Sequence, residues 1–214
     1  MKTEMVAPNA VIVANSFNPS VFSPLWLVKQ KLAEEDEILP GAIQSEVVTN
    51  VRTKRYALLV MPQQLQFVPA APDLAADLAA GVVGRIIETL PHVPYTAAGI
   101  NFVWFADPAE EGVATASRRL FFREGPVFRH FGEPDAHFGT YMSKAVLGGR
   151  LKLDIKPVTL KKGVSDAAPH RLQFIFNFHR DATDVGSLVE HIGRWRDFEH
   201  LARQIMDDLN EGVS

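Results

Sequence analysis

The sequence predicts an α+β fold: one curved antiparallel sheet made by two successive β-α-β-β-β-α units, with the helices packed on one face. Two observations predict it. The same order of strand and helix patterns occurs twice, and both passes open on an apolar strand that ends in a proline turn, VIVANSFNP at 11–19 and INFVWFADP at 100–108. Several strands also alternate between apolar and polar residues, which is typical of antiparallel sheets covered on one side. We expect a first repeat at 1–94 and a second at 95–214, sharing one continuous sheet.

The first unit opens with a β-branched apolar run at 11–17, which predicts a strand ended by the turn at 18–20. Ser23 followed by Pro24 predicts the start of a helix, because serine caps the first turn and proline fits the first helical position. Acidic residues at the C-terminus of a helix oppose its macrodipole. The run at 34–37 is therefore expected just beyond this helix, in solvent.

Three strands and a second helix complete the first unit. The strands are predicted at 43–51, 56–61 and 65–68, with the basic stretch 52–55 at a hairpin tip. Asp73 is expected to cap a helix that reaches Leu90, because apolar residues recur there every four positions. Two glycines inside this helix, Gly81 and Gly84, match no phosphate-binding motif and are expected to allow close packing. The prolines in 91–94 end the helix and mark the predicted joint between the units.

The second unit repeats this order. A strand is predicted at 99–106, and a helix that Gly112 interrupts is predicted at 109–122. The alignment that places Asp107-Pro108 on Asn18-Pro19 also places Phe102 on Val13. The later strands are predicted at 138–147, 151–160 and 171–179.

Local residue patterns also predict a hairpin turn, a loop and the closing helix of the second unit. Gly148-Gly149 is a strong signal for a two-residue hairpin between the first two of these later strands. Polar and small residues at 161–170 predict a mobile loop. A closing helix is expected over 185–209, because its apolar residues form one continuous stripe.

The composition excludes several classes of function. With 214 residues, 47% of them hydrophobic, the chain is long enough to bury a core without a metal or a disulfide. The net charge of −3 argues against a nucleic-acid partner, since phosphate binding usually requires a basic excess. The absence of cysteine excludes thiol nucleophiles and thiolate metal sites. The first residues indicate a strand rather than a signal peptide, and no segment has the ~20 apolar residues of a membrane span. We expect a soluble, cytoplasmic protein.

The densest group of chemically active side chains lies between Arg118 and Lys144, interleaved with phenylalanines. Clustered arginines beside aromatic rings suit an anionic or stacked ligand, because a guanidinium presents a planar fork of donors. The candidate ligand-binding residues are Arg118, Arg119, Arg129, His130 and His137. Four residues are further candidates for holding a metal, although their spacing matches no helical ligand pair: His130, Glu133, Asp135 and His137. The simpler interpretation is a connecting loop anchored by phenylalanines, with its charges in water.

Catalytic motifs are missing from the sequence. It has no G-x-S-x-G elbow, no P-loop and no dinucleotide-binding glycine motif, and its seven histidines are scattered. We therefore predict no catalytic residue and no cofactor.

The open face of the sheet is the remaining candidate. Alternation in the strands near 151–160 and 171–179 predicts a mixed, largely polar surface made of Lys152, Asp154, Lys156, Gln173, Ile175, Asn177 and His179. Such a surface suits a protein partner or a second copy, and an exposed edge strand would allow docking by strand addition. Our leading interpretation is a non-catalytic binding or assembly protein that forms a homodimer through its sheet.

The duplicated order of strands and helices, which spans most of the chain, resembles the saddle of the TATA-binding protein, without any shared motif. The opening APNAVIVANSF and the long terminal helix are similar to those of uncharacterised bacterial proteins, a resemblance that implies no activity.

Two alternatives stay open. A nucleic-acid-binding saddle, which the topology suggests, would need a basic concave surface and salt-sensitive binding. A small-molecule or metal-dependent enzyme with its site in 118–144 would need Arg129, His130 and an acidic residue or His137 to converge in a concave site.

Overall fold

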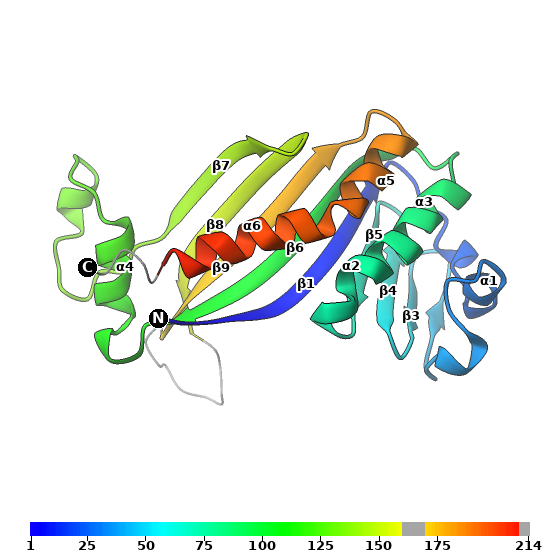
Figure 1. The fold of residues 1–214 in the computed structure, drawn as a ribbon, viewed down its shortest axis with the longest axis horizontal. Coiled ribbons are helices and arrows are strands. Elements are labelled where there is room, and N and C mark those ends of the chain that lie inside the picture. Colours follow the sequence, from blue (N-terminus) through cyan, green and yellow to red (C-terminus); the bar gives the residue numbers. More distant parts are fainter. Residues whose placement is uncertain (160–169, 210–214) are drawn as a thin grey trace.

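A nine-stranded antiparallel sheet forms the body of the protein in the computed structural model, which describes residues 1–159 and 170–209 (Figure 1). The strand order is β2-β3-β4-β5-β1-β6-β9-β8-β7. The strands are β1 (Lys2–Ala14), β2 (Ile43–Gln44), β3 (Thr49–Arg52), β4 (Tyr56–Met61), β5 (Gln64–Pro69), β6 (Tyr95–Asp107), β7 (Thr140–Val146), β8 (Gly149–Val158) and β9 (Arg171–Asp181). The predicted α+β class and antiparallel sheet are confirmed.

Helices cover one face of this sheet (Figure 1). They are α1 (Pro24–Lys29), α2 (Ala75–Leu78), α3 (Arg85–Thr89), α4 (Val113–Phe121), α5 (Val185–Gly193) and α6 (Trp195–Asp207). α2, α3, α5 and α6 lie across the face, whereas α1 and α4 lie at opposite ends of the sheet (Figure 1). Among the described helices, none has the length and apolar character that crossing a membrane requires.

Strands β1 and β6 pair with each other near the middle of the sheet, and the remaining strands follow outward on each side. Outward from this pair the order is β5, β4, β3 on one side and β9, β8, β7 on the other. Asn9 lies opposite Asn101, and both side chains lie on the open face. The alignment of Phe102 with Val13 is wrong by face, because Phe102 is buried and Val13 is exposed. Residues 15–17 lie between the end of β1 and its proline turn, whereas β6 runs up to Asp107, directly before its proline. An alignment on the two prolines therefore matches residues that lie on opposite faces of the sheet.

Two strand predictions need correction. β1 begins at Lys2, well before Val11, and pairs with β6 along almost its whole length. The predicted strand at 43–51 is two strands, β2 and β3, folded back on each other. The reversal comes from Ser45, whose hydroxyl accepts a hydrogen bond from the Val48 amide at 3.1 Å and donates one to the Val48 carbonyl at 3.0 Å. Serine side chains stabilise such turns by satisfying nearby backbone groups.

The hairpin between β7 and β8 turns one residue earlier than predicted. Val146 pairs with Gly149, so the two loop residues are Leu147 and Gly148. Their φ angles are +46° and +76°. Positive φ at both loop positions is the geometry of a type I′ turn, which matches the twist of the flanking strands.

The first helical segments follow the capping signals in part. The Ser23 hydroxyl accepts a hydrogen bond from the Trp26 amide at 3.1 Å, which confirms the predicted start of α1. Asp73 does not cap a helix, because it lies inside a short 3-10 turn at 72–74. The predicted helix at 73–90 is divided into α2 and α3 by a π-helical segment, Ala79–Gly84. A Cβ at Gly84 would lie 4.0 Å from Val189 of α5, whereas a Cβ at Gly81 would meet open space.

The later helices are also interrupted. Gly112, with a φ angle of +73°, separates a 3-10 turn at 109–111 from α4. The predicted helix at 185–209 is two helices that meet at Arg194, and Asp184 caps the first of them. The predicted mobile loop at 161–170 and the predicted strand end at Leu160 lie outside the described residues, apart from His170.

The core lies between the sheet and the helices. Alternate residues of the central strands are buried there, and α6 adds Trp195 and Phe198. The Phe102 ring contacts Trp195 edge to face at a centroid distance of 5.5 Å, and Phe178 stacks on Phe198 at 4.6 Å. Aromatic contacts of this kind add stability beyond the burial of their area. One continuous apolar core therefore joins β6 and β9 to the terminal helices.

Candidate functional site

Arg118 is committed to internal contacts. Its guanidinium lies over the rings of Phe122 and Phe138, with centroid distances of 5.3 and 5.0 Å. It also donates hydrogen bonds to the backbone carbonyls of Phe131 and Glu133. Because cation–π and hydrogen-bonding contacts together fix this side chain, Arg118 anchors the segment that follows α4. It is therefore not presented to a ligand.

Arg119 is likewise paired within the protein. Its Nε and Nη2 donate to the two carboxylate oxygens of Glu111 at 2.9 and 3.0 Å, a bidentate pair. The hydrogen bond from Arg119 lowers the pKa of Glu111, and the same contact raises the pKa of Arg119. This pair links α4 to the turn before it.

The remaining predicted residues of this region do not converge. All are exposed, and no hydrogen bond or ion pair joins their side chains within the described residues: Arg129, His130, Glu133, Asp135 and His137. Among the described residues, no three His, Asp or Glu side chains are placed to hold a metal ion. The concave site that an enzyme in 118–144 would need is not formed by these residues.

The open face of the sheet carries the residues that alternation predicted. On β8 and β9 the residues between them are buried against the helices, as Leu153 and Phe176 illustrate. A ladder of amides crosses the three central strands of this face. The side-chain amide of Asn177 donates to the Asn101 oxygen at 2.6 Å, and that of Asn101 donates to the Asn9 oxygen at 2.8 Å. The ladder fixes the register of these strands on a surface that no helix covers.

Of the two edge strands, β7 exposes the longer run of residues. It has seven residues, and those from Tyr141 to Ala145 are exposed, on both faces of the strand. Tyr141 and Met142 are 63% and 48% exposed. Helix α6 crosses β9 and β6 but leaves β7 uncovered (Figure 1). An exposed apolar edge strand offers unpaired backbone groups to another chain.

An apolar groove runs beside β7 on the helix side. Its volume is about 280 Å³, and it lies between β7, β8 and the last turns of α6. The residues that line it are Met142, Ser143, Lys144, Leu151, Leu153 and Ile205. Edge and groove together form one uncovered surface, which we call the β7 edge.

The opposite edge of the sheet is protected. Strand β2 has two residues, and the Gln44 amide donates to the Ser20 carbonyl at 2.9 Å. Behind it, the Thr49 hydroxyl donates to the Pro19 carbonyl at 2.7 Å. Short edge strands tied to neighbouring loops do not attract further strands. The two edges therefore differ in what they offer to a partner.

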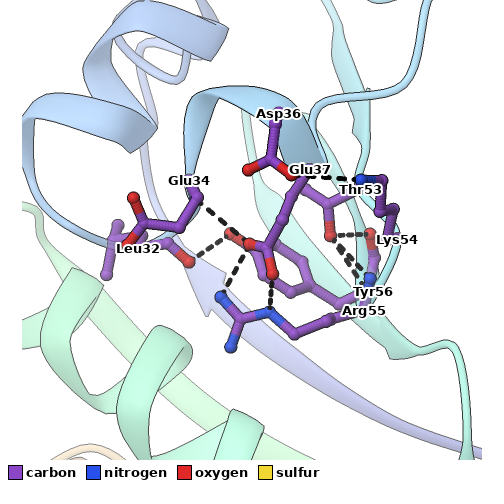
Figure 2. A network of polar contacts seen from close by, with 8 residues as sticks. All are labelled: Leu32, Glu34, Asp36, Glu37, Thr53, Lys54, Arg55 and Tyr56. Carbon is purple, nitrogen blue, oxygen red and sulfur yellow. Dashed lines mark hydrogen bonds and ion pairs between the residues drawn. The ribbon is translucent and has the colours of Figure 1, made fainter.

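A polar network at the tip of the β3–β4 hairpin joins two segments of opposite charge (Figure 2). Lys54 pairs with Asp36 at 3.2 Å, and Arg55 pairs with Glu37 at 2.6 Å. Burial alone would raise the pKa of Glu37, but hydrogen bonds from Arg55 and from the Glu34 amide leave it below its usual value. The buried Tyr56 hydroxyl donates to the Leu32 carbonyl at 2.9 Å. The acidic run lies beyond α1 and is mostly exposed, as predicted, but sequence reasoning missed its ion pairs with Lys54 and Arg55.

A hollow of about 370 Å³ adjoins this network, between the end of α1 and the π-helical segment. Its charged residues are mostly satisfied within the protein, since Arg55 is held by Glu37, and Asp77 accepts two hydrogen bonds from Arg196, each of 2.9 Å. The network therefore stabilises the fold, and the β7 edge is the candidate functional site.

No protein-family model matches this sequence, and no curated protein matches it.

Proposed function

We propose that the protein is a non-catalytic binding or assembly protein that forms a homodimer through the β7 edge of its sheet. The observation that carries the proposal is the seven-residue edge strand that is exposed on both faces and adjoins an apolar groove. Antiparallel pairing of β7 with β7 of a second copy would satisfy the outward backbone groups of both strands. It would also give the twofold symmetry that most soluble dimers have.

The side chains of β7 favour a second copy centred on Ser143. This register pairs all seven residues, because Ser143 is the midpoint of Thr140–Val146. Tyr141 then lies opposite Ala145 of the partner copy, and Met142 lies opposite Lys144. The single charge of the strand meets an apolar side chain in this register, so like charges do not face each other. Cross-strand pairs that combine large with small residues are compatible with a regular ladder.

The groove supports the same arrangement. A twofold axis through the Ser143 pair keeps the helix face of both copies on one side of the extended sheet. The two grooves, each lined by Met142, Leu153 and Ile205 of α6, would then lie on the same side of the joined sheet. Apolar area removed from water stabilises association by roughly 25 cal/mol per Å². A heterologous protein that added a strand at β7 would bury the same groove, and the experiment below separates the two cases.

The first measurement is light scattering of the purified chain over a wide range of concentration. We expect twice the mass of one chain for the native protein. Met142→Lys places a lysine opposite Lys144 at two symmetric positions, and it should weaken the dimer at least about tenfold. The double variant Met142→Lys with Lys144→Glu restores opposite charges across the same pairs, and it should recover the dimer.

The matched control is Ile43→Lys, which adds a lysine to an exposed position on the opposite edge strand. It should leave the dimer intact. A native protein that stays monomeric would refute self-association and favour a heterologous partner. A dimer that survives Met142→Lys but dissociates with Ile43→Lys would place the interface at β2 and refute the proposed β7 interface.

A further inference from the structure

The open face has a polar hollow where β8 begins and β9 ends, one strand inward from the β7 edge. Its volume is about 600 Å³, which is in the range of small-molecule sites. We infer that this hollow binds the phosphate group of a small phosphorylated molecule. Binding here does not depend on self-association, because Arg150 and Lys152 lie on the open face of β8, whereas the groove lies on the helix face. The residues that line the hollow are Gly148, Gly149, Arg150, Lys152, His179, Arg180, Asp181 and Thr183.

Three cationic or ionisable donors come from neighbouring strands of the same face. Arg150 lies directly opposite His179, and Lys152 is the next residue of β8 on this face. Lys152 forms no hydrogen bond or ion pair with any other described residue. Arg150 uses its Nε to donate to the Ser143 hydroxyl at 2.6 Å, which leaves both terminal amino groups of the guanidinium for a ligand. A guanidinium and an ammonium on adjacent positions are suited to a phosphate group.

Glycines make room for the ligand. Gly148 and Gly149 line the hollow where the hairpin enters β8, and neither has a side chain to fill it. Gly148 has a φ angle of +76°. A Cβ at Gly149 would approach the His179 carbonyl oxygen to 2.5 Å, which no side chain tolerates. The two glycines therefore keep one wall of the hollow free of side chains.

The anionic groups around the hollow limit the kind of ligand. Asp181 lies 3.0 Å from His179 Nε2, and Arg180 is held by Glu190 at 3.0 Å. Further along β8, Asp154 pairs with Lys156 at 3.4 Å. A nucleic-acid strand laid along this face would therefore meet carboxylates on both sides of the basic residues. A single phosphate group beside Arg150 and Lys152 presents far less negative charge to these carboxylates than a polynucleotide does, so we infer a small ligand.

The experiment is calorimetric titration of the native chain with inorganic phosphate and with glucose 6-phosphate, against sodium chloride at equal ionic strength. We expect saturable binding of both phosphate probes, and tighter binding of the sugar phosphate if it fills the hollow. Lys152→Ala should weaken binding about tenfold or more, since a charge-assisted hydrogen bond is lost. Lys152→Arg should retain most of it.

The matched control is Lys156→Ala, which removes a lysine from the same strand and face but outside the hollow. It should change the affinity less than twofold. An equal loss in both alanine variants would reduce the effect to general electrostatics and overturn the inference. No saturable binding of either phosphate probe would also overturn it, as would tighter, steeply salt-dependent binding of a single-stranded oligonucleotide. The dimer measured by light scattering is unaffected by either lysine variant if both proposals are correct.

Discussion

His191 is a fully buried histidine on α5 that contributes to stability in its neutral form. Its Nε2 donates to the Phe178 carbonyl at 2.9 Å, and its ring packs on Phe198. Nδ1 is buried without a hydrogen-bond partner among the described residues. Burial therefore lowers the pKa of His191 to about 4, against an ordinary value of 6.5, even though the hydrogen bond to Phe178 acts in the opposite direction.

This shift predicts a loss of stability in mild acid. Below pH 6.5 the unfolded chain binds a proton at His191 that the folded chain refuses until about pH 4. The free energy of unfolding should therefore fall by up to about 1.4 kcal/mol per pH unit as the pH drops through this window. Urea unfolding at pH 6.5 and pH 5 measures the slope. His191→Gln keeps a neutral donor and should flatten it; an unchanged slope in that variant would assign the acid sensitivity to other groups.

Arg118 shows how a candidate ligand-binding residue can be structural. Arg118→Ala removes two cation–π contacts and two hydrogen bonds, so we expect the free energy of unfolding to fall by about 1–2 kcal/mol. Hydrogen exchange in 122–138 should also become faster. Arg129→Ala, at an exposed position of the same segment, should change stability by less than about 0.5 kcal/mol. Equal effects of the two substitutions would contradict the anchoring role.

From the sequence we could predict which side chains have the chemistry to bind a ligand, but not which groups they contact in the fold. Clustered arginines suggested a ligand, and two of them are used internally because Glu111 and the loop carbonyls lie within reach of α4. Nothing in the spacing of Arg118 and Arg119 distinguishes an internal partner from an external one. The open-face residues were predicted correctly because strict alternation has one physical meaning in a sheet with one covered face.

At the scale of elements, local signals worked where a single side chain decides the geometry. Ser23 caps α1, and the strand at 56–61 has the predicted bounds. The predictions failed where apolar residues continue through a break. Val47 and Val48 extend an apolar pattern across a turn that Ser45 closes, and the terminal helix keeps its stripe through the bend at Arg194. Periodicity reports which side is buried, but it does not report where the chain bends.

The Leu147–Gly148 turn gives a prediction for one element. Leucine at a φ angle of +46° is unfavourable, because its Cβ crowds the backbone in the left-handed region. Leu147→Asn should raise the free energy of unfolding by roughly 0.5–1 kcal/mol, since asparagine tolerates this conformation and Leu147 is 40% exposed. Gly148→Ala should lower it by about 1 kcal/mol. Thermal unfolding measures both changes, and stabilisation by Gly148→Ala would contradict the type I′ geometry.

At the scale of the whole molecule, the two edges of the sheet could not be ranked from sequence. Which edge is open depends on where α6 lies, and that follows from the packing of Trp195 and Phe198 on the central strands. The repeated strand order predicts two similar halves, yet one half ends in a two-residue strand and the other in the exposed β7. The difference arises in the connections, which carry little periodic signal.

The central β1–β6 pair predicts that both halves unfold together. It is the longest pair in the described sheet, the Asn9–Asn101 contact reinforces it, and a single apolar core spans both halves. Pulse-labelled hydrogen exchange across a urea series should therefore show β4–β5 and β8–β9 losing protection at the same midpoint. Ile100→Val, in the buried centre of β6, should lower the free energy of unfolding by about 0.5–1.5 kcal/mol. Both urea midpoints should therefore fall by the same amount. A shift confined to β8–β9 would mean that the halves unfold separately, and the common sheet would then join two units without coupling their stability.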